Sequence, residues 1–171
     1  ENLSKTFRVK RKEIGLRGSV KAIFHPETEE IRAVNGVSFS VAEGEMLAFI
    51  GPNGAGKSTT IKMLTGILYP DGGRVEVLGV DPTKKRRQLA YQIGTVFGQK
   101  EQLWTHLTPY DNFRFFGAIY DLTERETEAR IGELSERFAL KEFIDTPVRN
   151  LSLGQRIRCE MVAALIHKPK V

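Results

Sequence analysis

Short apolar runs and turn residues alternate along the first third of the chain. Residues 37–41 alternate apolar and polar side chains, which predicts a half-buried strand. Residues 46–50 are all apolar, a run typical of a strand that is covered on both faces. Glycine-rich residues 51–56 follow at once, and residues 57–67 predict the helix that this loop opens. The pattern therefore predicts a strand, a tight loop and a helix in direct succession.

The next segments predict one more alternation of strand and helix. Turn residues cluster at 69–73, ahead of a predicted strand at 74–78. A short helix is predicted at 83–91 and a further strand at 93–97. Strands that alternate with helices are typical of an α/β fold, and we assign the chain to that class.

From residue 109 onward the pattern is helical. Residues 109–120 are rich in aromatic side chains, and Thr123 with Glu126 predicts a capping box at the next helix start. A last helix is predicted at 156–167. Two apolar helical faces, which we interpret as packing surfaces, are formed by Ile131, Leu134 and Phe138 and by Ile157, Met161, Ala164 and Leu165.

Residues 8–30 match neither period and predict an inserted loop or a short extra hairpin. Much of the net charge of +5 lies in or near this segment, in Arg8, Lys10, Arg11, Lys12, Arg17 and Lys21. Such a basic run either contacts nucleic acid or acidic lipid or forms a solvated loop, and we favour the loop. No aromatic residues alternate with these charges, as a platform for single-stranded nucleic acid would require.

Composition limits the other possibilities. A chain of 171 residues with 40% hydrophobic and 27% charged residues fits one globular domain. Its longest apolar stretches, at 46–50 and 161–166, are too short to cross a bilayer, and its first residues do not resemble a secretory signal. We therefore expect any link to a membrane to run through a partner. The single cysteine, Cys159, excludes an internal disulfide, and we expect a buried, inert thiol.

Residues 51–59 fit the phosphate-loop pattern G-x-x-x-x-G-K-[ST] without a mismatch. Glycines let successive backbone N–H groups turn inward around a phosphate, and the start of a helix adds its positive dipole end. We expect Lys57 to reach the β- and γ-phosphates, the Ser58 hydroxyl to bind Mg²⁺, and Thr59 to support the α- or β-phosphate. This loop alone does not separate ATPases, GTPases, kinases and helicases.

Two further segments narrow the choice. Residues 151–155 place Ser152 and Gly154 at the start of a predicted helix, which is either a second anion site or a simple N-cap. Gln99 follows a predicted strand, where its amide either reaches a metal ion or the attacking water or lies on the surface.

Together these segments resemble the ABC ATPase family, in its order and spacing, from about Ile31 to the end of the chain. Residues 51–59 resemble its Walker A loop, Gln99 its Q-loop glutamine, and residues 151–155 its signature motif. Residues 97–100, 102–104 and 149–155 look like the ATP-binding subunits of ABC-2-type exporters, in the drug- or viologen-exporter branch.

The resemblance implies a P-loop NTPase core with an antiparallel β subdomain and an α-helical signature subdomain. One incomplete nucleotide-binding domain would cover residues 1–171, with the β subdomain and core at 1–98 and the helical subdomain at 99–171. Phe7 would stack on adenine, with Phe24 as a competitor for that role. ATP and Mg²⁺ are the implied cofactors, with Ser58 and Gln99 at the metal and Gln99 and Lys57 in catalysis. The implied nucleotide contacts are Gly51, Asn53, Gly54, Ala55, Gly56, Lys57, Ser58 and Thr59 and, for the ATP of the opposing subunit, Ser152, Gly154 and Gln155.

The resemblance also implies partners and a location. We expect a second nucleotide-binding domain, transmembrane permease subunits, and a place on the cytoplasmic face of the membrane. Leu153 stands where the family has glycine, and the sequence ends at Val171, before the family's Walker B aspartate, catalytic glutamate and switch histidine. We therefore expect a truncated ATPase with little turnover by itself. The alternatives are a soluble ABC ATPase on ribosomes or DNA, although we do not expect nucleic acid as a partner, and a GTPase or small-molecule kinase.

Overall fold

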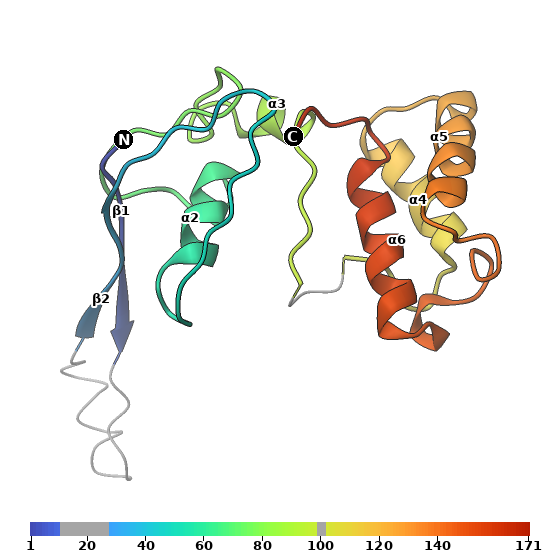
Figure 1. The fold of residues 1–171 in the computed structure, drawn as a ribbon, viewed down its shortest axis with the longest axis horizontal. Helices are drawn as coiled ribbons and strands as arrows, with labels where there is room; N and C mark the ends of the chain where they lie inside the picture. The colour runs from blue at the N-terminus through green and yellow to red at the C-terminus, as the bar shows by residue number, and fades with distance from the viewer. Residues whose placement is uncertain (11–27, 99–101) are drawn as a thin grey trace, which may run out of the picture. The chain divides into compact units, whose positions relative to one another are not determined.

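The computed structural model describes residues 1–10, 28–98 and 102–171. These residues divide into two compact units, Glu1–Leu89 and Ala90–Val171. The sequence-based division at residues 98 and 99 stays a prediction. Figure 1 shows the strands and the first helix in one unit and the long helices in the other.

The first unit contains an antiparallel strand pair, β1 (Leu3–Lys10) and β2 (Thr28–Val37) (Figure 1). Leu3 lies opposite Val37, and Arg8 lies opposite Glu30 and forms an ion pair with it at 3.0 Å. The segment 8–30, predicted as an insertion, therefore begins and ends inside paired strands. Its residues 11–27, with Phe24 and most of the basic run, lie outside the described residues.

A small apolar cluster holds this unit together. Met63, from helix α2 (Lys57–Leu64), is fully buried against Leu3 and Val34 of the strand pair and against Val75. The turn before Val75 is tied to β1 through Asp71, whose carboxylate accepts bonds from the Lys5 ammonium at 2.8 Å and the Thr6 amide at 2.7 Å. The bond from Lys5 is the main reason why the pKa of Asp71 is lowered. The same cluster thus places α2 against β2.

Several predicted strands of this unit are not formed. Among the described residues β1 and β2 form the one sheet, so the predictions at 74–78 and 46–50 are wrong for this structure, and of 37–41 only Val37 lies in a strand. Met46 and Ile50 are 97% and 94% exposed. The physical reason is that a strand needs a hydrogen-bonded neighbour, and no described segment pairs with residues 46–50.

The helices of the first half are shorter than predicted. α2 ends at Leu64 rather than at residue 67, because the chain turns at Gly66, where φ is +72°. Helix α3 covers Arg86–Ala90 and not 83–91. The Asp81 carboxylate holds the preceding turn by accepting bonds from the Thr83 amide and hydroxyl.

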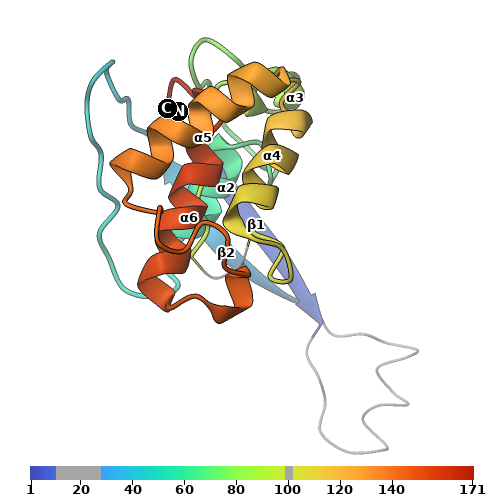
Figure 2. The same ribbon diagram turned by 90° about the vertical axis from the view of Figure 1, so that its right-hand side faces the viewer.

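The second unit is a helical bundle. It contains α4 (Pro109–Ile119), α5 (Glu124–Arg137), the short 3₁₀ helix η1 (Val148–Asn150) and α6 (Leu153–Leu165). α4 contacts both α5 and α6, and the three helices lie side by side in Figures 1 and 2. The buried core between them is built by Phe113, Ile131, Leu134, Leu140, Val148, Cys159, Val162 and Ile166.

Two predictions in this unit are confirmed. Thr123 and Glu126 form the predicted capping box at the start of α5, with the side chain of each bonded to the backbone N–H of the other. Cys159 is completely buried, and burial raises the pKa of its thiol to about 11. A thiol with this pKa carries almost no thiolate near neutral pH, so Cys159 is inert.

The predicted apolar face of the last helix, interpreted as core or interdomain packing, is buried only in part, since Leu165 packs against the core. Ile157 and Met161 are 45% and 42% exposed, whereas Cys159, Val162 and Ile166 are buried. Both sets of positions have helical spacing, so the periodicity by itself does not decide which face turns inward. Packing against the rest of the bundle selects the second set.

The predicted strand at 93–97 is not assigned as a strand either, although its start is paired. The Val171 amide donates to the Gln92 carbonyl at 3.3 Å, and the Gly94 amide donates to the Val171 carbonyl at 2.6 Å. This is the bonding pattern of a parallel bridge between Ile93 and Val171.

Within the described ranges, no helix combines the length and the apolar character needed to span a bilayer.

The α5 capping box gives a first prediction. Thr123→Ala should lower the free energy of unfolding by about 1 kcal/mol, because the Glu126 N–H at the helix start loses its acceptor. The matched control on the same helix is Ser135→Ala, since the Ser135 hydroxyl is buried without a hydrogen-bond partner among the described residues. Urea unfolding followed by circular dichroism should show a change within about 0.5 kcal/mol for the control. Equal losses in both variants would contradict the assignment.

His167 gives a prediction about pH. Burial lowers the pKa of His167 below its ordinary value of 6.5, and Arg130 adds to this, although the bond to the Ile93 carbonyl opposes it. The folded state therefore binds fewer protons than the unfolded state, so the free energy of unfolding should fall as pH drops from about 7 to about 5.

The measurement is urea unfolding at several pH values. The imidazole of His167 stacks on the Tyr120 ring, with 3.7 Å between the ring centroids, and His167→Phe preserves a ring in that place. This variant should reduce the dependence of the free energy of unfolding on pH. His106→Gln removes the other described histidine of the helical unit and serves as the control. A slope unchanged by His167→Phe and reduced by His106→Gln would show that another group is responsible.

Candidate functional site

The predicted phosphate loop lies in the first unit and runs directly into α2. Gly54 and Gly56 both have φ of +84°, in the left-handed region that favours glycine. Gly56 is the N-cap of α2. It has no side chain, so it offers the first N–H groups of the helix no side-chain acceptor. A loop of this shape ending at a helix start presents N–H groups and a positive dipole end to an anion.

Gly56 also lies directly on the strand pair. A Cβ atom at this position would overlap the carbonyl oxygen of Ala33 and crowd the Val34 side chain. At Gly54 an added Cβ would meet no atom within 4 Å. Glycine is therefore required at Gly56 for two independent reasons, its conformation and its packing against β2.

Lys57 is the charged group of the loop. Its ammonium donates to the carbonyl oxygens of Gly51 and Pro52, both at 2.6 Å. No carboxylate pairs with it in the described part of the chain. Neutral carbonyls hold this cation weakly compared with a phosphate oxygen, so the side chain can exchange one for the other.

The hydroxyl residues after Lys57 differ in exposure. Ser58 is exposed on the first turn of α2 and Thr59 is half-buried, whereas Thr60 is buried. The Thr60 hydroxyl donates back to the Gly56 carbonyl at 3.0 Å. Ser58 is thus the hydroxyl that can face a metal ion, and Thr60 is a structural residue that the sequence analysis did not identify. In the sequence, only its position four residues after Gly56 points to this role of Thr60, and that is a weak indication.

The structure gives Phe7 a defined position in β1. Phe7 is half-buried and lies opposite Ile31 in the ladder, and the Lys5 ammonium lies 5.8 Å from its ring centroid. Ile31 stands two residues before Ala33, the residue that contacts Gly56, which corresponds to about 7 Å along the strand. This distance is compatible with a ring beside a nucleotide held at the loop. Its role as the adenine contact stays a prediction.

Gln99 lies outside the described residues. The segment from residue 102 onward is held by Asn112, which was not among the predicted site residues. Asn112 of α4 is 1% exposed, accepts a bond from the Trp104 amide at 2.8 Å, and donates to the carbonyls of Trp104 and Thr108. A buried amide with all these bonds satisfied fixes the backbone that it binds. A polar residue among aromatic neighbours was the available signal.

The predicted signature residues form the start of α6. The Gln155 amide donates to the Ser152 hydroxyl at 3.3 Å, and the Ser152 amide donates to the Gln155 side chain at 2.8 Å. This is a capping box, so Ser152 is the N-cap of α6, and its role in a second anion site stays a prediction. Leu153 is 72% exposed, and a Cβ on Gly154 would meet no atom within 4 Å. The turn is therefore open to a ligand from outside the chain.

The phosphate loop belongs to the first unit and the signature turn to the second, and each is described within its own unit. Among the described residues no group of three or more potential metal-binding side chains is found.

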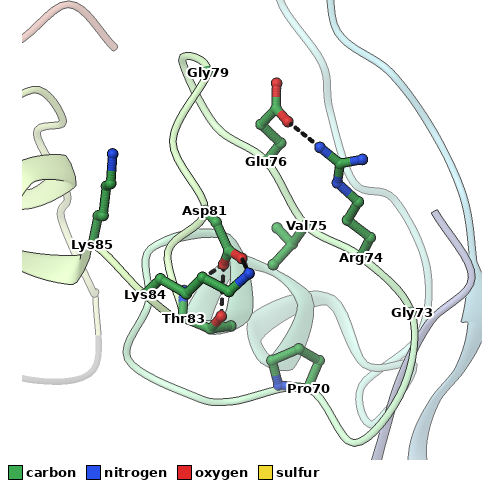
Figure 3. A pocket seen from close by; sticks show the side chains of 10 residues that line it. All are labelled: Pro70, Gly73, Arg74, Val75, Glu76, Gly79, Asp81, Thr83, Lys84 and Lys85. Atoms are coloured by element: carbon green, nitrogen blue, oxygen red, sulfur yellow. Dashed lines mark hydrogen bonds and ion pairs between the residues drawn. The ribbon is translucent and has the colours of Figure 1, made fainter.

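A shallow hollow of about 470 Å³ lies elsewhere in the first unit, and Figure 3 shows its lining. Arg74 pairs with Glu76 at 2.9 Å, and Lys84 lies 3.6 Å from the Asp81 carboxylate. None of the predicted site residues lines it. Because its carboxylates are already paired with cations of the same hollow, we do not assign it a ligand.

Known proteins match this chain over most of its length. The family model described as ABC transporter matches residues 34–171. The ABC transporter ATP-binding protein NatA of Bacillus subtilis (strain 168) is 34% identical over 148 residues, which are 86% of this chain and 60% of NatA. The Nod factor export ATP-binding protein I of Rhizobium meliloti (strain 1021) is 38% identical over 138 residues, which are 81% of this chain and 41% of that protein.

A solved structure shows the same fold. It is the dimeric ATP-binding cassette MJ0796 in a post-hydrolysis state with ADP and Pi, with a TM-score of 0.75 and 25% identity. The match covers 99% of this chain and 69% of that one. The fold is therefore that of a P-loop NTPase cassette. The chain spans less than two thirds of the length of the two relatives named above.

The contrast between Gly54 and Gly56 gives a prediction. Gly54→Ala should lower the free energy of unfolding by about 1 kcal/mol, the cost of a side chain in a left-handed conformation. Gly56→Ala should cost about 2–5 kcal/mol, because overlap with the Ala33 carbonyl is added. Urea unfolding without nucleotide measures both changes. Equal costs for the two variants would show that the contact between Gly56 and β2 is not as described.

Proposed function

This chain belongs to the ABC transporter family, and from that membership we propose that it is the ATP-binding subunit that powers a transporter, an exporter of the ABC-2 type. The relatives support this proposal, because those named above are ATP-binding proteins of transport systems and one carries export in its name. They do not favour the alternative of a soluble ATPase acting on ribosomes or DNA.

The observation that carries the proposal is the phosphate loop. Gly54 and Gly56 take the left-handed conformation, α2 begins directly after Gly56, and Lys57 has no carboxylate partner among the described residues. We propose that this loop holds the triphosphate of ATP, with Gly51, Asn53, Ala55 and Thr59 as further contacts and with Phe7 against the adenine.

The loop also fits a magnesium–nucleotide complex. Ser58 is exposed at the start of α2, where its hydroxyl can complete the coordination of an ion that is held mainly by phosphate oxygens. We propose Ser58 and Gln99 as the protein ligands, with Gln99 also orienting the attacking water. The ion would neutralise charge on the β- and γ-phosphates.

We propose that two copies, or this chain and a related one, close around ATP. Ser152, Gly154 and Gln155 would contact the nucleotide held by the partner, because this turn is open and presents a hydroxyl and N–H groups at a helix start. The dimeric state of the similar cassette supports this arrangement. The γ-phosphate would favour the closed dimer because it makes more contacts there than in the open state.

Residues 51–59 include no carboxylate and no histidine, so this loop provides no general base for water. We propose that this chain binds ATP and dimerises, and that hydrolysis belongs to the assembled transporter. In that assembly the chain would lie on the cytoplasmic face of the membrane, with permease subunits as partners. The residues of α4 and Gln99 would transmit closure to them.

Lys57→Ala tests the proposal. Loss of the charge-assisted bonds to the β- and γ-phosphates should weaken ATP binding roughly 10- to 100-fold. Lys62→Ala removes the same charge from the other end of α2 and should leave the affinity almost unchanged. Fluorescence titration with an ATP analogue measures both, with GTP as a competitor. ATP binding that survives Lys57→Ala would sink the proposed function, and a clear preference for GTP would reassign it.

A further inference from the structure

Two arginines connect α5 and α6 near opposite ends. Arg158 of α6 donates to the carbonyl oxygens of Phe138 and Ala139, just beyond α5, each at 3.2 Å. Arg130 of α5 donates to the carbonyl oxygen of Leu165, the last residue of α6, at 2.9 Å. The final carbonyls of a helix lack partners within the helix and form the negative end of its dipole. Each arginine therefore caps the C-terminal end of the other helix.

Arg158 has a further contact that fixes its direction. Its guanidinium carbon lies 4.9 Å from the centroid of the Phe143 ring, and Phe143 is 6% exposed in the core. Phe143 belongs to the connection that leads from α5 into η1 and the signature turn. A guanidinium that stacks on a buried ring and bonds two carbonyls is held far more rigidly than a lysine ammonium would be.

The signature turn, residues 151–155, is thus restrained on both sides. Ahead of it, the amides of Val148 and Arg149 donate to the carbonyls of Leu107 and Thr105 at 3.0 and 2.9 Å. Behind it, Arg158 stands six residues after Ser152, which is about 9 Å along the helix. The contact made by Arg130 is at Leu165, about 20 Å from Ser152 along the same axis.

From this geometry we propose that Arg158 is a positioning residue for the signature turn. It holds the first turns of α6 against the α5 end, and so fixes where Ser152 and Gly154 meet the nucleotide of the partner subunit. Arg130 makes the equivalent cap at the distant end of α6 and contributes to stability without setting this position. The inference rests on the proposed function, because it concerns closure of two subunits around ATP.

The experiment compares Arg158→Met with Arg130→Met in the full chain. Each substitution removes one guanidinium that caps a helix end, and Arg130→Met also removes the ion pair with Glu133, so urea unfolding should show a loss of stability in both variants. ATP binding, measured by fluorescence titration, should be unchanged in both, because the phosphate loop lies in the other unit. Dimerisation is measured by sedimentation with ATP and Mg²⁺, at a temperature where both variants are folded.

Arg158→Met should weaken ATP-dependent dimerisation about tenfold, the effect of losing charged hydrogen bonds that hold the turn, and Arg130→Met should weaken it less than about threefold. Arg158→Lys retains the charge and should recover part of the loss, and it replaces Arg158→Met if that variant does not fold. Equal dimerisation of the Arg158 and Arg130 variants would overturn the inference. A wild-type chain that binds ATP yet stays monomeric would instead overturn the proposed dimerisation, and the inference with it.

Discussion

The contact between Gly56 and the Ala33 carbonyl is the constraint on which the candidate site depends. It brings the end of the phosphate loop against β2 with no room for a side chain, and α2 begins immediately afterwards. Met63, about two helical turns after Gly56, is buried against Leu3 and Val34 and holds the helix in that place. The direction of the helix dipole and of the loop N–H groups therefore follows from packing between one backbone and another.

In the helical unit, the ends of short helices are held by side-chain bonds to backbone groups. Thr108, Thr123 and Ser152 each accept a bond from a backbone N–H at the start of α4, α5 and α6. Arg130 and Arg158 satisfy carbonyls at the ends of α6 and α5. Ser152, which caps α6, is also a proposed contact to the nucleotide of the partner subunit. In the proposed function, stability and binding would therefore share one helix end.

Local patterns predicted the helices better than the strands. The capping box of Thr123 and Glu126 and the helix at Pro109–Ile119 involve contacts within a few residues, and both are present. Residues 46–50 have the composition of a buried strand but stand exposed, because a strand is completed only by a neighbour that the composition does not specify. For α6 the periodicity allowed two faces, and contact with the bundle selected Cys159, Val162 and Ile166 over Ile157 and Met161.

By itself the sequence determined the chemistry of the phosphate loop. The spacing of Gly51, Gly56 and Lys57 fixes which residues can curl around a phosphate, because conformational freedom and charge are properties of single residues. Only the tertiary structure decided that Gly56 packs on Ala33, that Asn112 holds Trp104, and that Arg158 caps α5. These contacts join residues far apart in the chain or on different helices, and their geometry arises only when the surrounding side chains pack together.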